Sequence, residues 1–564
     1  MRDGKRRIAV VTAIVVAATI VGGCAGNAND GGTPPRGSQP TIGHNDINPQ
    51  PPDKIKNGGT VQWPVDELAT NWNENELDGA NTSGKPMVDA VVPALFRARP
   101  DGVIEPDPDY LTSARLRSTD PQVVEYKLNP KATWSNGRRF DWDDLRVQWQ
   151  ALNGRNTAYL AAKTTGYDSI SSVERGADDE DVIVTFARDF GEWRGLFSPL
   201  YPKEINADPQ EFNKGWANTP KITAGPFKVG AVDLTAKTAT LVRDPKWWGA
   251  TPHLDSIVFK VVARNALADA LASGAIDFYR IGSSTDLFRR ASTMPGVTVR
   301  QALEDSYNLL DFMGAPPSLL GDQATRVAVE QGVDTQAIAK ALLGPMQPNP
   351  VPLGNHFFVH GNSDYRDNSA PVAFNPDAAR RQLDSLGWKT SGQFRAKDGK
   401  PLQLAFVIDS GNPIAAGIAT LVQGQLKDIG VDARINAVPS GDLIKNYVHT
   451  GAYDLIFYGM SMSPQPLSSA RSSFYLGPNN SLENTSHIGN EATNRLLDQA
   501  GAELDDAKRV DLLQQADVEI WKTGHILPLY QVPGAYAVRA TLANFGAFGF
   551  AQFPIDYSDI GFMK

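Results

Sequence analysis

The sequence predicts an α/β fold divided into two lobes. One observation is a succession of strand and helix patterns between residues 402 and 458, where apolar runs alternate with segments of helical spacing. A second is length, because about 500 residues follow the N-terminal segment and exceed what a single hydrophobic core serves. A third is the ordinary globular composition, with 41% hydrophobic residues among 564.

The alternating unit consists of three predicted strands and two predicted helices. Apolar runs rich in β-forming residues predict strands at 402–408, 431–438 and 453–458. Between them, the apolar side chains are spaced as on a helix at 414–429 and 443–448. Because the connections are short, these strands are expected to lie in a largely parallel sheet.

The ends of the first and third strands form the predicted ligand site. Ligands of wound α/β sheets bind beyond the carboxyl ends of the strands, and parallel strands bring those ends to one edge. The first strand ends at Asp409, and the third is expected to stop at Gly459 and lead into a loop. The residues alone leave open whether Phe457 and Tyr458 belong only to the core. The site residues predicted from this pattern are Asp409, Tyr458, Gly459, Met460, Ser461, Met462 and Ser463.

The N-terminal segment is typical of an exported lipoprotein. Basic residues precede an apolar run over 8–21, and small residues lead to Cys24, the single cysteine. The run is shorter than the roughly 20 residues that span a membrane, so a signal peptide is expected at 1–23. The predicted use of Cys24 is lipidation; the alternative is an uncleaved anchor with an incidental cysteine. Residues 24–56, rich in Gly, Pro and Asn, are predicted to form a flexible tether.

Charge and motifs favour a binding protein. The net charge of −9 is interspersed along the chain, and the lack of a basic stripe argues against nucleic acid as a partner. The chain has no catalytic or phosphate-binding motif, so no enzyme and no cofactor are predicted. Two possible metal sites are disfavoured. The acidic turn at 178–181 matches no standard calcium loop, and Pro and Gly residues around His356 and His360 oppose a helix there.

The rest of the chain is predicted to supply further strands and helices. Asp141 and Asp334 are expected to cap helices, and Gly274 to end one. The adjacent Trp247 and Trp248 are expected to pack between strands, with a sugar-stacking platform as the alternative. Strands are expected at 60–65, 91–99, 123–128, 182–186, 241–243, 257–262, 304–311 and 526–532, and helices at 266–273, 323–331, 334–343, 491–499 and 507–523.

Several motifs together resemble one known family. Gly225-Pro226-Phe227 and the run Asp244-Pro245-Lys246-Trp247-Trp248 carry the most specific match, and Gly459 ahead of Pro464 carries another. The chain thus resembles the oligopeptide- and dipeptide-binding lipoproteins of ABC importers, the family 5 extracellular solute-binding proteins. The resemblance implies a two-lobed, periplasmic-binding-protein-like fold of type II with an extra subdomain and a ligand cleft between the lobes. It assigns 57–88, 209–305 and 530–564 to the core of lobe I, 89–208 to the extra subdomain and 306–529 to lobe II.

The resemblance also implies further site residues. An early turn, a crossover strand and a returning strand would contribute Trp72, Asn73, Tyr307, Asn308 and Tyr530 to the cleft. The chain departs from the family at two positions, where Met460 replaces a Trp and Ser463 replaces the Asp that holds a peptide's amino terminus. Either Asp409 takes over that role, or the ligand has no free amine, or the loop is shifted in register.

The function expected from this resemblance is capture of a solute outside the cytoplasm. The protein would be held by its lipid on the outer face of the cell membrane and would deliver a small peptide to the permease and ATPase of an ABC importer. The alternatives are another solute, such as a sugar or a metal chelate, and a cell-envelope regulatory lipoprotein that kept the fold without transport. A hydrolase ranks third.

Overall fold

The computed structural model describes residues 45–80, 83–347, 349–477, 484–551 and 554–564, which fall within one compact unit. The predicted signal peptide, Cys24 and the first part of the predicted tether lie outside the described residues. Among the helices that are described, none combines the length and the apolarity needed to cross a membrane.

The tether predicted for residues 24–56 is wrong in its last part. Asp46 forms a backbone bridge with Ala547, and its carboxylate accepts a hydrogen bond from Arg300 Nη1 at 2.7 Å. Ile55 is buried and forms a second bridge with Met563. Composition alone predicts no structure here, but pairing with the C-terminal segment satisfies the backbone and holds these residues in place.

A first four-stranded sheet has the order β1-β10-β9-β8. β1 pairs with β10 in parallel, and the other pairs are antiparallel. The inward residues Val61, Trp63 and Phe259 lie in one buried cluster, as the alternation in these strands requires. The strands predicted at 60–65, 241–243 and 257–262 are confirmed as β1 (Thr60–Val65), β9 (Thr238–Arg243) and β10 (Ser256–Val261), joined by β8 (Phe227–Asp233).

A second four-stranded sheet is antiparallel throughout, with the order β4-β5-β7-β6. It comprises β4 (Leu111–Thr119), β5 (Gln122–Leu128), β6 (Ile170–Arg175) and β7 (Asp181–Phe186). α2 (Trp142–Leu152) packs beside it and begins in a capping box formed by Asp141 and Asp144, which confirms the predicted N-cap. Trp247 and Trp248 pack against Tyr110, next to this sheet, with ring centroids 5.8 Å apart in each case.

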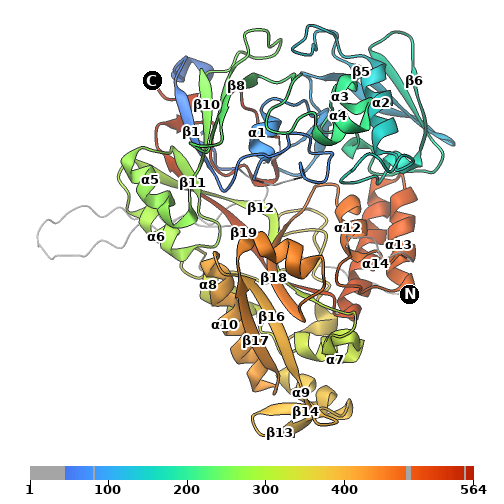
Figure 1. Cartoon of the computed structure of the whole chain (residues 1–564), viewed down its shortest axis with the longest axis vertical. Coiled ribbons are helices and arrows are strands. Elements are labelled where there is room, and N and C mark those ends of the chain that lie inside the picture. The colour runs from blue at the N-terminus through green and yellow to red at the C-terminus, as the bar shows by residue number, and fades with distance from the viewer. Residues whose placement is uncertain (1–44, 81–82, 348, 478–483, 552–553) are drawn as a thin grey trace, which may run out of the picture. The chain divides into compact units, whose positions relative to one another are not determined.

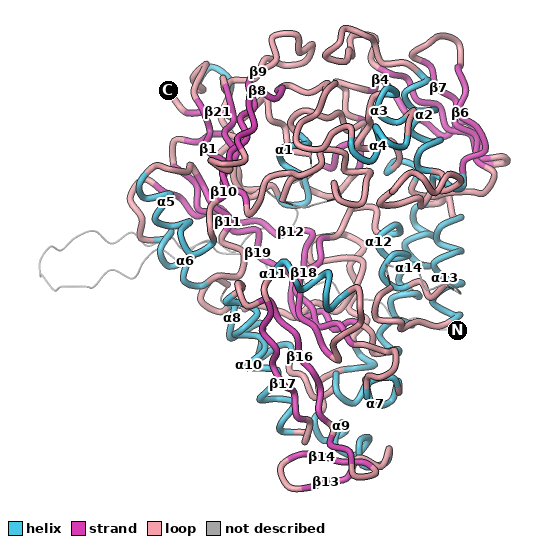
Figure 2. Tube along the Cα trace, viewed as in Figure 1, coloured by secondary structure: helices cyan, strands magenta, loops and turns pink. Residues whose placement is uncertain are grey.

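A six-stranded sheet contains the predicted alternating unit (Figures 1 and 2). Its order is β11-β19-β12-β18-β16-β17, and only β16 with β17 and β16 with β18 are parallel. The prediction of a parallel sheet therefore holds for those three strands but is wrong for the sheet as a whole. β12 and β19 come from distant parts of the sequence and join antiparallel. The strands are β11 (Phe278–Arg280), β12 (Val297–Phe312), β16 (Gln403–Asp409), β17 (Asp432–Val438), β18 (Leu455–Ser461) and β19 (Ile526–Arg539).

The pairing of β12 with β19 is interrupted at one point. The register slips between Leu303 and Tyr307, so that three residues of β12, Glu304, Asp305 and Ser306, face a single residue of β19. Such a bulge bends the strand and re-aims its side chains. It lies beside the end of β18, because Ser306 pairs with Ser461.

The helices mostly follow the sequence prediction. Asp334 caps α8, and Gly274 ends α5 in the left-handed conformation, both as expected. The predicted strand at 91–99 is shorter, because Val91 and Val92 donate backbone hydrogen bonds to Val88 and continue the turn of α1. The helices are α1 (Lys85–Asp89), α3 (Lys203–Asn206), α4 (Pro209–Lys214), α5 (Leu267–Ser273), α6 (Thr285–Ser292), α7 (Gln323–Glu330), α8 (Thr335–Leu343), α9 (Pro376–Ser385), α10 (Pro413–Asp428), α11 (Ser440–Asp442), α12 (Leu467–Phe474), α13 (Glu491–Ala502) and α14 (Asp506–Thr523).

Short elements complete the fold. The segment predicted as a helix at 443–448 forms η7 (Leu443–Val448), a π-helix. Minor strands are β2 (Phe96–Ala98), β3 (Ile104–Pro106), β13 (Lys389–Ser391), β14 (Phe394–Lys397), β15 (Lys400–Pro401), β20 (Leu542–Ala543) and β21 (Gly561–Phe562), and single 3-10 turns are η1 (Pro52–Lys54), η2 (Tyr167–Ser169), η3 (Trp193–Gly195), η4 (Arg264–Ala266), η5 (Leu319–Gly321), η6 (Ala370–Val372) and η8 (Gly549–Ala551).

Candidate ligand-binding site

The end of β18 lies further along the chain than predicted. Gly459, Met460 and Ser461 pair with Asn308, Tyr307 and Ser306 of β12, so the prediction that the strand stops at Gly459 is wrong. The strand continues because β12 offers backbone partners up to the bulge. The loop begins at Met462, whose amide donates a 2.6 Å hydrogen bond to the Asp305 carbonyl.

The predicted edge of the parallel strands is confirmed. Phe406 and Val407 of β16 lie opposite Leu455 and Ile456 of β18, so Asp409 and the end of β18 point the same way. The Asp409 carboxylate accepts hydrogen bonds from the Gly411 amide at 2.8 Å and the Ser440 hydroxyl at 2.7 Å. One carboxylate oxygen of Asp409 is therefore already hydrogen-bonded within the protein.

The loop itself presents small polar groups. Ser461 and Ser463 are exposed, and Met462 is half-buried. The Ser463 hydroxyl accepts a hydrogen bond from the Gln465 amide at 3.2 Å, which forms a local turn. The loop can therefore offer hydroxyl and backbone groups to a ligand, but no charge.

Tyr458 belongs to a buried polar network. Its hydroxyl donates to Asp311 at 3.0 Å, and the same carboxylate accepts a 2.5 Å hydrogen bond from Ser486. Burial raises the pKa of Asp311 to about 6. Phe457 is buried in the core. Phe457 is therefore a core residue, and the Tyr458 hydroxyl is occupied by its hydrogen bond to Asp311.

Tyr307, Asn308, Met460 and Tyr530 are brought together by β12, β18 and β19. The Tyr307 hydroxyl donates to the His356 carbonyl at 3.2 Å and contacts Met460 Sδ at 3.4 Å. Asn308 donates to the Tyr530 hydroxyl at 2.9 Å. Both tyrosines are fully buried. This group therefore lies in the paired strands that lead into the loop.

Trp72 and Asn73 lie away from this group, in the core of the first sheet. The Trp72 indole donates to the Asn218 carbonyl at 3.1 Å, and the Asn73 amide donates to the Phe212 carbonyl at 2.8 Å. Both side chains are fully buried. The charged neighbour Glu74 accepts a hydrogen bond from Lys85 at 3.2 Å, and Lys85 also donates to Asp89 at 2.8 Å.

Asp305 was not predicted, and it is the most unusual group near the loop. Its side chain is 7% exposed, and the hydrogen bonds and ion pairs of the described residues provide its carboxylate with no partner. Burial and the neighbouring Glu304 raise the pKa of Asp305 to about 7. At or next to the bulge, Ser306 Oγ and Gln531 Oε1 are fully buried and lack partners within the described structure. Buried polar groups are normally paired, so the unpaired groups at this bulge mark a place where a ligand can supply a partner.

A signal for Asp305 exists in the sequence. Glu304 and Asp305 are adjacent inside a strand whose successive side chains alternate between its faces. One of the two must therefore point inward unless the strand bulges. Glu304 is the one that is neutralised, by an ion pair with Arg280.

Glu192 connects a distant segment to the loop. Both of its carboxylate oxygens accept the amide of Leu467, at 3.0 and 3.1 Å, at the first residue of α12. The Gly191 amide donates to the Gly501 carbonyl at 2.8 Å. Glu192 is 3% exposed, and burial raises its pKa to about 7. Since α12 directly follows the loop, Glu192 helps to fix the loop's far end.

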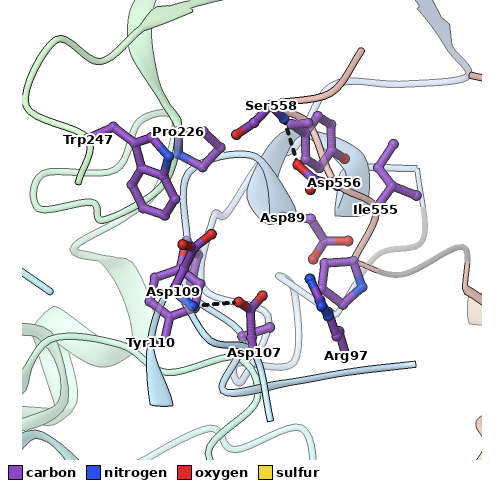
Figure 3. Close-up of a pocket in the computed structure, with 14 residues that line it drawn as sticks. Asp89, Arg97, Asp107, Asp109, Tyr110, Pro226, Trp247, Ile555, Asp556 and Ser558 are labelled. Carbon is purple, nitrogen blue, oxygen red and sulfur yellow. Dashed lines mark hydrogen bonds between the residues drawn. The ribbon is translucent and has the colours of Figure 1, made fainter. Parts of the chain in front are cut away.

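A separate small pocket lies beside α1 (Figure 3). Its volume is about 60 Å³, and none of the predicted site residues lines it. Burial raises the pKa of Asp107 to about 6, and this carboxylate accepts the Asp109 amide at 3.0 Å. Within the described residues, no group of three or more His, Cys, Asp or Glu side chains is arranged to hold a metal ion. The pocket's charged lining residues are Asp89, Arg97, Asp107, Asp109 and Asp556.

Solved structures of solute-binding proteins share this fold. A periplasmic EDTA-binding protein, EppA, superimposes with a TM-score of 0.84 at 24% identity, covering 94% of this chain and 100% of that one. The oligopeptide-binding protein AppA from Bacillus subtilis, solved with a nonapeptide, superimposes with a TM-score of 0.78 at 18% identity, covering 91% and 100%. The predicted two-lobed α/β fold is confirmed.

Sequence comparison identifies the family. The model of the bacterial extracellular solute-binding proteins, family 5 middle region, matches residues 105–481. The oligopeptide-binding protein OppA of Mycobacterium tuberculosis is 38% identical over 560 residues, which is 99% of this chain and 94% of OppA. A probable monoacyl phosphatidylinositol tetramannoside-binding protein of M. tuberculosis, LpqW, is 24% identical over 70% of this chain and 66% of its own. The chain belongs to the family 5 bacterial extracellular solute-binding proteins, which bind solutes and are not enzymes, as the sequence predicted.

Proposed function

We propose that this protein captures peptides outside the cytoplasm and delivers them to the permease and ATPase of an ABC importer. The similarity to oligopeptide-binding proteins, at 38% identity over nearly the whole chain, supports peptide as the ligand class. The observation that carries the proposal in the structure is Asp305, a buried carboxylate beside the candidate ligand loop with no partner among the residues that the structure describes. A ligand with a positively charged group at this point would form an ion pair with the Asp305 carboxylate.

The chemistry of a peptide's amino terminus fits this point. An ammonium group is a hydrogen-bond donor, and the Asp305 carboxylate at the β12 bulge is an acceptor of opposite charge for it. A buried charge is costly unless it is paired, so pairing with the ligand turns this cost into affinity. Asp305 thus takes the role for which Ser463 lacks the charge and for which Asp409 is already engaged.

The remaining predicted residues would act around this anchor. Ser461, Met462 and Ser463 present exposed or half-buried groups to a bound chain. The adjoining strands would hold these groups in place through the hydrogen-bonded residues Tyr307, Asn308, Met460 and Tyr530. Gly459, which has no side chain, leaves room beside Asn308. Four predicted residues would not contact the ligand directly, because their side chains are buried or hydrogen-bonded within the protein: Trp72, Asn73, Tyr458 and Asp409.

The lobe boundaries proposed from the resemblance are supported by the sheets. All strands of the first sheet fall within 57–88 and 209–305, and those of the second within 89–208. β12 begins before residue 306, so it carries the chain from one lobe range into the other. Closing of such lobes around a ligand is the motion we expect.

Native mass spectrometry of the gently purified protein tests the proposed function. We expect the intact mass to exceed the chain mass by peptide-sized increments, and the released ligands to sequence as peptides. A sugar or a metal chelate would give a different mass and fragmentation, and would replace the peptide assignment. An empty protein that binds none of a set of alternating alanine–glycine peptides of three, five and nine residues would contradict the proposal and favour a regulatory role.

We further propose that a lipid on Cys24 anchors the protein to the outer face of the cell membrane. Cys24→Ala removes the acylated thiol, and the two acyl chains of a diacylated cysteine are what stable anchoring requires. The variant is expected in the soluble fraction or as uncleaved precursor, whereas Ser38→Ala in the same segment should fractionate like the wild type. Recovery of processed Cys24→Ala protein with the membrane would refute the anchor.

A further inference from the structure

A short segment of the extra subdomain, residues 189–195, reaches the helices that follow the candidate ligand loop. We call this segment the strap. Its Gly191 amide donates a 2.8 Å hydrogen bond to the Gly501 carbonyl in α13. The proposed lobe boundaries place the strap in 89–208 and α13 in 306–529. The strap therefore joins the two proposed lobes.

The strap is held in shape by its own subdomain. The buried Gln122 side chain accepts from the Phe190 amide at 2.7 Å and donates to the Phe190 carbonyl at 3.0 Å. On the other side of Glu192, the Tyr126 hydroxyl donates to the Trp193 carbonyl at 3.2 Å. Both supporting side chains come from β5. Glu192 is therefore fixed from within the extra subdomain and does not need the opposite lobe to hold its place.

The first amide of α12, in contrast, depends on the strap. Pro466 stands at the N-cap position of this helix and provides no side-chain cap. Leu467 is fully buried, and its amide is bound by both carboxylate oxygens of Glu192, at 3.0 and 3.1 Å. A buried amide without an acceptor is costly. Because α12 follows the ligand loop directly, its first turn is completed only where the two proposed lobes meet.

The strap also fits closely against the opposite lobe. A methyl group on Gly191 would lie 2.2 Å from the Glu503 carbonyl oxygen and 2.8 Å from Arg509 Nη1. Its three nearest atoms all belong to these two residues, which lie in the range of lobe II. The φ angle of Gly191 is not in the left-handed region, so its backbone also accepts alanine. Glycine at this position therefore serves the contact between the lobes.

We propose that the strap is a closure contact, in which Glu192 positions the end of the ligand loop once the lobes close. This inference rests on the proposed function and adds a positioning residue to it. Since Glu192 is held ready by its own subdomain, its hydrogen bonds to α12 are gained on closure. A contact made only in the closed state favours that state and so strengthens ligand binding. Its loss weakens binding although no group that touches the ligand is removed.

Two variants break this contact in different ways. Glu192→Met removes the acceptor, whereas Gly191→Ala keeps it and adds a methyl group that prevents the strap from seating. Calorimetry with alternating alanine–glycine peptides of three, five and nine residues should show about tenfold weaker binding for both. Small-angle scattering at saturating peptide should show a larger radius of gyration than for the wild type. Glu192→Gln, whose amide oxygen still accepts a hydrogen bond, should retain most of the affinity.

Two control variants separate closure from stability. Gly424→Ala adds the same methyl group to α10, where it meets open space, and should bind peptides like the wild type. Asn490→Ala removes the cap that α13 receives from its own N-cap residue. It should lower the melting temperature and leave peptide affinity unchanged, because this cap lies within one lobe.

Melting temperatures establish that each variant is folded, and if one of the two strap variants does not fold, the other decides. Lower melting temperatures with wild-type affinity and radius of gyration in Glu192→Met and Gly191→Ala would make the strap a purely structural contact and overturn the proposal. Weaker binding in Gly191→Ala but not in Glu192→Met would overturn the role of Glu192. Failure of every peptide to bind the wild type contradicts the proposed function itself.

Discussion

Two charged clusters in this protein differ in how their charges are balanced. In the Lys85 cluster, Lys85 pairs with Glu74 and Asp89 at 3.2 and 2.8 Å. In the β12 bulge, Asp305 is equally secluded but has no cation among the described residues. Burial raises the pKa of Glu74 and of Asp305, in each case to about 7. The two clusters differ in the presence of a cation, and we propose that Lys85 stabilises the fold whereas Asp305 pairs with a ligand.

The largest effect is expected in the balanced cluster. Lys85→Met leaves Glu74 and Asp89 secluded without their cation, and breaking a buried ion pair by removing one partner costs about 3 kcal/mol or more. Urea denaturation should therefore show a clear loss of stability. The exposed pair of Lys221 and Glu211 is the matched control, since Lys221→Met should cost less than about 1 kcal/mol. Equal losses in the two variants would remove the distinction between the clusters.

A smaller effect of opposite sign is expected at Asp305. Its pKa is raised from 3.8 to about 7, so the folded state holds a proton that the unfolded state releases. This group's contribution to stability is fully present below pH 3.8 and is lost as the pH rises through 7. Asp305→Asn should thus raise the stability of the ligand-free protein at pH 8, by about 1–2 kcal/mol, and flatten its dependence on pH between 5 and 8.

Thermal melting of both proteins across that pH range checks this prediction. The Asp409→Asn variant is the control, because that carboxylate already accepts hydrogen bonds from the Gly411 amide and the Ser440 hydroxyl. A lower melting temperature for Asp305→Asn at pH 8 would show that Asp305 is a structural group, like those around Lys85.

The sequence predicted regions whose signal is local. The strands β16 and β17 and the helix α10 follow from apolar periodicity, and the parallel register of β16 with its neighbours places Asp409 and the end of β18 at one edge, as expected. The capping residues Asp141 and Asp334 are equally local, since each acts within one turn of its own helix.

The groups missed by sequence reasoning depend on contacts between distant segments. Asp305 is buried where the register of β12 against β19 slips, and the sequence shows the adjacent acidic pair Glu304 and Asp305 but not the slip. The same reason explains why β18 runs past Gly459, since only its partner β12 determines where pairing ends.

Calorimetry with free and N-acetylated peptides tests the central claim most directly. The alternating alanine–glycine peptides of three, five and nine residues are compared in both forms on the wild type, Asp305→Asn and Asp409→Asn. We expect the wild type and Asp409→Asn to prefer the free amine by about ten- to a hundredfold, and Asp305→Asn to bind both forms alike. A preference for the free amine that persists in Asp305→Asn, or that disappears in Asp409→Asn, would contradict the assignment of Asp305 as the anchor of the peptide's amino terminus.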